Sequence, residues 1–303
     1  MEKKWVEWAL AAAVAWVVPW LMLGLMGPGP EAPEEAAPVT APREERIWVL
    51  LDGEPVEMAL DFYLTGVLLG EMPKSFHEEA KMAQAVVART YALRTAARGA
   101  KHPGFVCTNS GCCQSWQDPE AFPDTEAVAM AREAVEATAG LVLCYGGELI
   151  EATYFSCSGG RTEDAVAVWG SDVPYLQSVE SPGEEMAAHF RDTAVFSLEA
   201  VREKLGLSGK PVFRNWRYTE GGGVAAVEVS GKEFTGTELR RLLGLRSAAF
   251  TVEVVGQEVR FHTAGYGHRV GMSQYGAQAM AEKGADFREI LEHYYPGTEM
   301  VGS

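Results

Sequence analysis

The chain has 303 residues, of which 47% are hydrophobic, and a formal net charge of −16. This length allows one large domain or two small ones, and the apolar content suffices for a sizeable core. The negative charge argues against a nucleic-acid partner, because proteins that bind nucleic acids need a basic face.

Residues 8–26 form an uncharged run of nineteen residues, close to the roughly 20 that span a bilayer as a helix. Lys3 and Lys4 precede the run, and no basic residue follows until Arg43. The positive-inside rule therefore predicts a single transmembrane helix, with residues 1–7 in the cytoplasm and the rest of the chain outside. A cleaved signal peptide is the alternative, and the length of the run argues against it.

Residues 27–46 are rich in proline, alanine and glutamate without a periodic apolar pattern, so we expect an extended acidic linker. Residues 47–303 then form the extracytoplasmic part. Its helical and strand patterns predict an α+β fold, with one mixed α/β domain and a smaller β-rich subdomain at about 209–263. That subdomain is expected from a helix at 237–243, capped by Thr237, and from short apolar runs at 224–229, 251–255 and 258–263.

The stretch 61–99 predicts two helices joined at Glu71-Met72-Pro73. Apolar residues recur at helical spacing before this junction, Gly70 interrupts them, and Pro73 disfavours helical geometry at Met72. Glu71 is therefore expected on a short non-helical link held by rigid elements on both sides. That is a suitable position for an acid catalyst, and a solvated loop glutamate is the alternative.

The second helix of this stretch has a predicted start and end. Ser75 and Glu78 have the spacing of a capping box, and Gly99 supplies a stop. Its apolar face is formed by Phe76, Ala80, Ala83, Val87 and Tyr91.

Three of the five cysteines follow closely, at Cys107, Cys112 and Cys113, with His102 upstream. Thiolates and imidazole are the ligands that zinc favours, usually four in a tetrahedron. A disulfide between Cys107 and Cys113 is the alternative, because disulfides persist outside the cell.

Beyond the cysteines, 125–138 predicts a helix, and 141–145 and 148–155 predict two strands joined by Gly146-Gly147. Residues 182–209 are less regular and less informative. Two glycine-rich motifs complete the chain, and both could contact a ligand through backbone or polar groups. They contain Ser158, Gly159, Gly160 and Arg161 in the first and His268, Ser273, Gln274 and Tyr275 in the second. The alternatives are a glycine-rich turn with a surface arginine, and a helix cap at Ser273.

Three segments together resemble the stage II sporulation protein D family, the SpoIID/LytB domain. They are YLTGVLLGEMP with FHEEAKMAQAVVARTYAL, then SGGRT, and the glycine-rich run that ends in MSQYGA. Arg269 stands where the family usually has glycine, and Cys112 where it usually has histidine. The resemblance implies a membrane-anchored lytic transglycosylase with Glu71 as catalytic acid. It also implies a structural zinc bound by His102, Cys107, Cys112 and Cys113, and substrate binding by Ser158, Gly159, Gly160, Arg161, His268, Ser273, Gln274 and Tyr275.

The family's reaction cleaves the β-1,4 bond between N-acetylmuramic acid and N-acetylglucosamine in peptidoglycan and leaves a 1,6-anhydro ring. By resemblance, the chain would act during spore engulfment on glycan strands without stem peptides, beside a cell-wall amidase and a membrane partner. It would lie in the mother-cell membrane facing the forespore. Two alternatives remain: a non-catalytic peptidoglycan-binding enhancer of an amidase, and a zinc hydrolase. Four protein ligands leave zinc no open position, which argues against the hydrolase.

Overall fold

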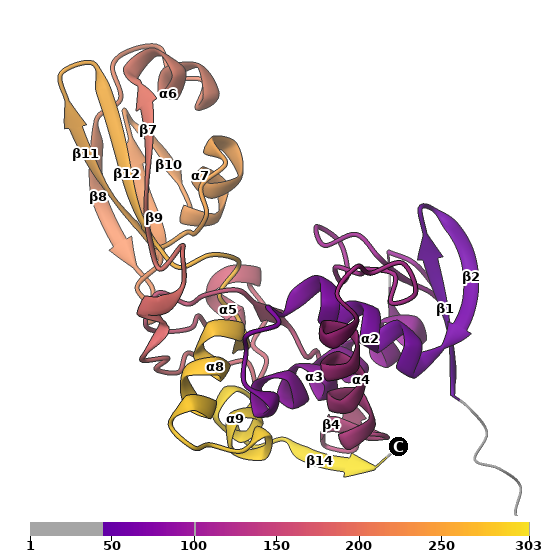
Figure 1. The fold of residues 1–303 in the computed structure, drawn as a ribbon. Helices are drawn as coiled ribbons and strands as arrows, with labels where there is room; N and C mark the ends of the chain where they lie inside the picture. The colour runs from indigo at the N-terminus through magenta and orange to yellow at the C-terminus, as the bar shows by residue number, and fades with distance from the viewer. Residues whose placement is uncertain (1–44, 100, 303) are drawn as a thin grey trace, which may run out of the picture. The chain divides into compact units, whose positions relative to one another are not determined.

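The computed structural model of the chain describes residues 45–99 and 101–302. The predicted membrane span at 8–26 lies outside these residues, as does the predicted linker up to residue 44. No helix within the described residues is long and apolar enough to cross a membrane. The described chain mixes eight α-helices with five small sheets, so the predicted α+β class is confirmed there (Figure 1).

The first sheet begins with a tight hairpin. β1 (Arg46–Leu51) runs antiparallel to β2 (Glu54–Ala59), and Asp52 and Gly53 between them have φ values of 52° and 90°. Left-handed residues at both central positions match the right-handed twist of the flanking strands. The short strand β3 (Val106–Cys107) then pairs in parallel with β1, which places Cys107 opposite Leu50.

The predicted helix pair exists as α2 (Leu60–Glu71) and α3 (Glu78–Arg98), but two details of the prediction were wrong. Glu71 is the last residue of α2 and does not lie on the link. Gly70 stays helical, and a Cβ atom there would lie 2.9 Å from the backbone of Ser115 and Trp116. The glycine is therefore needed for the close approach of that segment, which is a different role from breaking a helix.

The start of α3 also differs from the capping box predicted at Ser75. His77 caps the helix, and its Nδ1 accepts from the N–H of Glu79 at 3.3 Å. The residues before it form a turn instead, because Lys81 Nζ donates to the carbonyls of Lys74 and Phe76. The predicted apolar face of α3 is otherwise confirmed, and the helix ends at Gly99 as expected.

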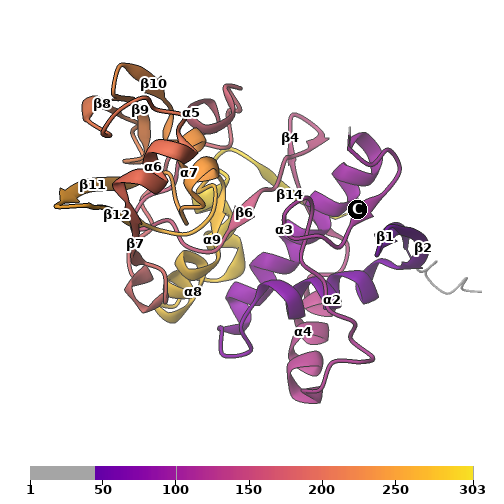
Figure 2. The ribbon, with the colours of Figure 1, turned by 90° about the horizontal axis from the view of Figure 1, so that it is seen from above.

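α3 is the central helix of the domain. Both views place it between α2 and α4 (Thr125–Ala137) on one side and α8 (Gln274–Glu282) and α9 (Phe287–Tyr294) on the other (Figures 1 and 2). One buried cluster joins α3 to α8 and α9, and a second joins it to α2 and α4. The two packed faces hold the C-terminal end of α2 rigidly against the rest of the domain.

The strand predicted at 148–155 is divided in two. β5 (Glu148–Leu149) pairs with β4 (Leu141–Tyr145), which also pairs with β14 (Glu299–Gly302). Between the two parts, Ala152 and Thr153 donate to carbonyls only two residues back, so the chain turns. β6 (Tyr154–Phe155) then pairs in parallel with β13 (Met272–Ser273). This long-range pair brings Tyr154 beside the start of α8.

Residues 158–190 connect this part to the β-rich part through two short helices, α5 (Ala165–Trp169) and η1 (Glu184–Met186). The β-rich part has its own buried core, built from two three-stranded sheets in the orders β10-β9-β8 and β11-β12-β7. Its elements are β7 (Arg191–Ser197), α6 (Leu198–Lys204), β8 (Phe213–Tyr218), β9 (Val224–Val229), β10 (Lys232–Phe234), α7 (Gly236–Leu243), β11 (Phe250–Val255) and β12 (Glu258–Ala264).

Three features of the β-rich part were not predicted from sequence. β7 lies within the less regular stretch 182–209. Its side chains are all exposed or half-buried and no face of it is fully apolar, so it has no clear strand pattern. β8 carries a register irregularity between Arg214 and Arg217, which disturbs its alternation. The cap of α7 is Thr235, in a capping box with Glu238, and the predicted cap at Thr237 was wrong.

Candidate active site

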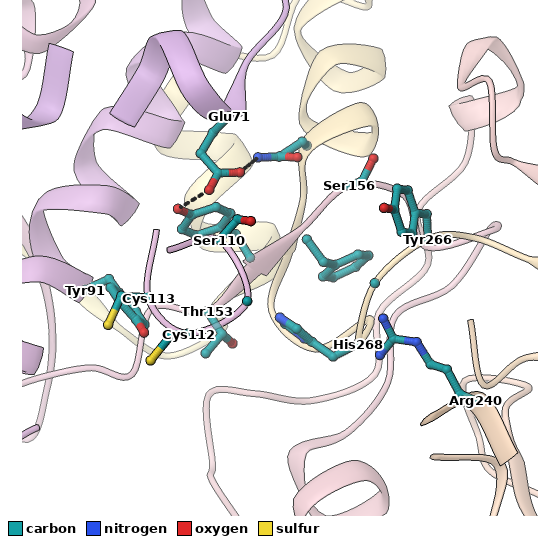
Figure 3. Close-up of a pocket in the computed structure, with 15 residues that line it drawn as sticks. Glu71, Tyr91, Ser110, Cys112, Cys113, Thr153, Ser156, Arg240, Tyr266 and His268 are labelled. Carbon is teal, nitrogen blue, oxygen red and sulfur yellow. Dashed lines mark hydrogen bonds between the residues drawn. The ribbon is translucent and has the colours of Figure 1, made fainter. Parts of the chain in front are cut away.

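An open pocket of about 520 Å³ lies at the C-terminal end of α2 (Figure 3). It is bounded by the loop of the cysteine cluster, by the segment around β6, by the loop before β13 and by one side chain of α7. The lining residues are Glu71, Tyr91, Ser110, Gly111, Cys112, Cys113, Thr153, Tyr154, Phe155, Ser156, Arg240, Tyr266, Gly267, His268 and Gln274.

Glu71 enters this pocket with three hydrogen-bond donors around its carboxyl group. Oε1 accepts from the backbone N–H of Ser115 at 2.7 Å and from the hydroxyl of Tyr154 at 3.3 Å. Oε2 accepts from Nε2 of Gln274 at 3.2 Å. Each carboxylate oxygen has about two acceptor positions. Oε1 is therefore saturated, while Oε2 keeps one position at which a proton can be held.

Burial raises the pKa of Glu71 above its ordinary value, and the bonds from Ser115, Gln274 and Tyr154 oppose that rise. Desolvation disfavours the charged form, whereas donors stabilise it. Burial thus shifts the carboxyl group towards its protonated form, and the three donors still offer partners to the carboxylate. A group that must give a proton and then take one back needs both properties.

A chain of hydrogen bonds extends behind Tyr154. Gln114 Nε2 donates to the Tyr154 hydroxyl at 3.2 Å, and Tyr63 donates to Gln114 Oε1 at 3.0 Å. Gln114 is fully buried, and both tyrosine pKa values are raised by burial, so the hydroxyls stay protonated. Tyr154 therefore acts as a donor to Glu71 with its orientation set by buried partners.

The His/Cys cluster adjoins the same pocket. One nitrogen of His102 and the Sγ atoms of Cys107, Cys112 and Cys113 all lie within 4.8 Å of one another. Tetrahedral zinc with Zn–S bonds of about 2.3 Å would separate its ligand atoms by roughly 3.8 Å. The donor set and its spacing therefore fit a metal ion, and the four residues could hold one. All three thiols are free, so no Cys107–Cys113 disulfide is present.

The first glycine-rich motif does not line the pocket. Ser158 is fully buried, and Glu184 Oε2 accepts from its backbone N–H, from its hydroxyl and from the N–H of Gly159, each at 2.8 Å. Arg161 donates to Glu220 at 2.7 Å, and Gly160 donates to the Ser158 hydroxyl. The motif is thus a loop organised around one buried carboxylate.

The second motif divides between pocket and core. Gln274 and His268 line the pocket, whereas Ser273 caps α8 by accepting from the N–H of Gly276 at 3.1 Å. Tyr275 packs its ring edge-on against Phe76. Of the site residues predicted from sequence, Glu71, His268 and Gln274 line the same pocket. Two of the four predicted metal ligands, Cys112 and Cys113, line it as well.

His268 is a neutral imidazole. Burial, and after it the positive charge of Arg240, lower the pKa of His268 to about 4. Its Nδ1 accepts from the N–H of Val270 at 3.2 Å, and its ring packs against Phe155 and Trp169. The exposed Trp169 beside it supplies an aromatic face at the edge of this group.

Several residues in or directly behind the pocket were missed by sequence reasoning. Gln114 and Ser115 directly follow Cys113, and that adjacency was the one local signal for them. Tyr154 and Arg240 carry no local signal, because strand pairing and the packing of α7 bring them to the pocket.

These observations define a class of protein: a mixed α/β domain with one half-buried carboxyl group in an open pocket, beside a cluster able to hold a metal. Residues 54–145 match the family model described as "Stage II sporulation protein". That segment contains Glu71 and all four residues of the His/Cys cluster.

Individual relatives extend the match over most of the chain. Stage II sporulation protein D of Bacillus amyloliquefaciens is 37% identical over 253 residues, covering 80% of this chain and 74% of the relative. The protein of that name from Bacillus subtilis is 33% identical over 280 residues, covering 88% and 80%. The Amidase enhancer of Bacillus subtilis is 30% identical over 298 residues, covering 78% of this chain and 40% of that protein. The chain therefore belongs to the stage II sporulation protein D family.

Proposed function

We propose that the protein is a lytic transglycosylase that cleaves peptidoglycan glycan strands, with Glu71 as general acid and base. One observation carries the proposal. Among the described residues that line the pocket, Glu71 is the single carboxyl group, and burial favours its protonated form. Most glycosidases use a pair of carboxyl groups. A lytic transglycosylase needs one, because its substrate supplies the nucleophile.

The reaction has two proton transfers, one from Glu71 and one back to it from a different group. Glu71 donates the proton on Oε2 to the oxygen bridging N-acetylmuramic acid and N-acetylglucosamine, and the bond from C1 of the muramic sugar to that oxygen breaks. The carboxylate then accepts the proton of the C6 hydroxyl of the same sugar. The C6 oxygen bonds to C1 and closes a 1,6-anhydro ring, so no water is consumed. Ser115, Tyr154 and Gln274 stabilise the carboxylate between the two transfers.

The metal in this proposal is zinc, held by His102, Cys107, Cys112 and Cys113. Three thiolates and one imidazole are a usual donor set for structural zinc, and four protein ligands leave no position for a substrate. Bound zinc would supply folding free energy and would hold the loop that leads to Gln114 and Ser115.

The cellular setting is proposed from the family and from the first 46 residues. The span at 8–26 anchors the domain on the outer face of the mother-cell membrane, towards the forespore. The domain acts there during engulfment on strands without stem peptides, beside a cell-wall amidase and a membrane partner. The name of one relative, Amidase enhancer, supports the association with an amidase.

That same relative favours a second candidate function, a glycan-binding enhancer of an amidase without catalysis of its own. Product analysis separates the two. The full chain is incubated with purified glycan strands, and the products are examined by mass spectrometry. Ends of 1,6-anhydro-N-acetylmuramic acid, lighter by one water than hydrolysis products, are expected. Ordinary reducing ends would reject the transglycosylase, and acceleration of an amidase without any cleavage would support the enhancer.

A further inference from the structure

The pocket that holds Glu71 also contains an arginine without a partner. Arg240 lies in the last turn of α7, and Figure 3 shows its side chain directed into the pocket that Glu71 enters from α2. Within the described residues, no hydrogen bond, ion pair or ring contact involves its guanidinium group. Other half-buried or buried arginines are paired: Arg161 with Glu220, Arg246 with Asp192 and Arg269 with Glu163.

Arg240 is the cation of the pocket. Of the lining residues in the described chain, it is the single lysine or arginine. His268 beside it is neutral, because its pKa is about 4. Burial lowers the pKa of Arg240 as well, yet a guanidinium remains charged in proteins. The pocket thus combines one acid with one free cation, in a chain whose net charge is −16.

Helix electrostatics do not account for the position of Arg240. A cation in the last turn stabilises the helix dipole, and both Arg240 and Arg241 lie in that turn. Arg241 is exposed and does not line the pocket. The two residues share the dipole effect, so the orientation of Arg240 into the pocket needs another reason. Five N–H donors in a planar fork match a carboxylate or a phosphate.

The proposed substrate carries one such group, and this step rests on the proposed function. The sugar rings of a glycan strand are uncharged, and each muramic sugar bears a lactyl ether that ends in a carboxyl group. That group is a free carboxylate in a strand without stem peptides. It is a neutral amide wherever a peptide is attached. We propose that Arg240 binds the free lactyl carboxylate of a muramic sugar in the pocket, and so selects strands without stem peptides.

Binding measurements test this in the Glu71→Gln background, where strands are not cleaved. The full chain in detergent is titrated with peptide-free strands, with the same strands after conversion of the lactyl carboxylates to methylamides, and with peptide-bearing strands. Removing Arg240 by Arg240→Gln should raise the Kd for peptide-free strands about 10- to 100-fold, the range for hydrogen bonds to a charged group. Binding of the methylamide strands should not change.

Two further variants serve as controls. Arg241→Gln removes the same charge from the same helical turn and should leave all three Kd values unchanged. Arg240→Lys keeps the charge without the planar fork and should fall between Arg240→Gln and the parent. Equal losses on free and methylamide strands would overturn the proposal, as would no loss at all. Loss confined to peptide-bearing strands would also overturn it, by assigning Arg240 to a stem-peptide carboxylate. If the Kd values follow the expected pattern but the protein with Glu71 intact cleaves no strands, the proposed transglycosylase activity is refuted and the role of Arg240 in binding stands.

Discussion

The backbone N–H of Ser115 donates a 2.7 Å hydrogen bond to Oε1 of Glu71. Ser115 lies two residues after Cys113, and Gln114 between them orients Tyr154, the second donor to the same oxygen. The loop that carries the His/Cys cluster is therefore also the loop that holds the acid. A change in the cluster should reach Glu71 through two hydrogen bonds.

The first prediction concerns this coupling. Removing the metal with a chelator, or replacing Cys113 with serine, should destabilise the domain by several kcal/mol, because ligands of a structural metal hold folding free energy. Cleavage should fall in the same preparations. Metal analysis and thermal unfolding measure both effects. Cys144→Ser, at a buried free cysteine outside the cluster, is the control and should retain the metal. A purified protein without zinc and with a mapped Cys107–Cys113 disulfide would reject the metal site.

The second prediction concerns Glu71→Gln, which keeps the shape of the side chain but cannot deliver a proton. Cleavage should fall by at least about 10²–10⁴-fold, the usual contribution of general acid–base catalysis. Strand binding should persist. Glu136→Gln, on the exposed side of α4, should cleave normally. Unchanged cleavage by Glu71→Gln would place the acid elsewhere.

The stability of this variant provides a third prediction, whose sign follows from the raised pKa of Glu71. Below its ordinary pKa, the carboxyl group is protonated in both the folded and the unfolded state, and its contribution to stability is fully present. As the pH rises through the raised pKa, the folded state must ionise a buried group, and the contribution is lost. Wild type should therefore lose stability relative to Glu71→Gln as the pH rises from below the ordinary pKa of glutamate to above the raised pKa of Glu71. Thermal unfolding of both proteins across that range measures the difference. If their stabilities change with pH in parallel, the prediction is wrong.

Tyr154→Phe tests the donor to Glu71. The Tyr154 hydroxyl lowers the pKa of Glu71, so its removal should raise that pKa further. Because the first step needs the protonated acid, the alkaline limb of the kcat/KM profile should move to higher pH, while the maximal rate falls. Tyr145→Phe removes a hydroxyl from an exposed tyrosine and should leave the profile in place. If the alkaline limb does not move in Tyr154→Phe, the Tyr154 hydroxyl does not influence the pKa of Glu71.

Local sequence patterns predicted the elements whose signals are local. The helices α2, α3 and α4 and the proximity of His102 to the cysteines follow from spacing and end signals. The surroundings of Glu71 do not. Tyr154 reaches Glu71 because β6 pairs with β13. The paired residues Tyr154 and Met272 are 118 residues apart in the sequence. Gly70 was interpreted as a helix breaker. Its actual role is close packing against residues 115–116, and only the tertiary structure reveals that contact.

The last prediction concerns Arg269, which stands where the family usually has glycine. Its φ of 69° explains the glycine preference, because the left-handed region costs other residues about 1–2 kcal/mol. The side chain compensates by pairing with Glu163, both groups being at most 4% exposed, and by donating to the carbonyls of Ser158, Arg161 and Gly221. It thereby joins the first glycine-rich motif to the β8–β9 turn.

Arg269→Gly should relieve the backbone and yet leave Glu163 as a buried, unpaired charge, at a cost of about 3–5 kcal/mol. The net expectation is a loss of about 1–4 kcal/mol in the free energy of unfolding. Glu163→Gln in the glycine background removes that charge, so the double variant should be more stable than Arg269→Gly alone. Asp52→Gly replaces an exposed left-handed residue that has no buried ion pair. Aspartate tolerates this region better than most residues, so stability should change by less than about 0.5 kcal/mol. Chemical denaturation of the four proteins measures the differences. If Arg269→Gly is as stable as wild type, the ion pair contributes nothing beyond the strain that it offsets.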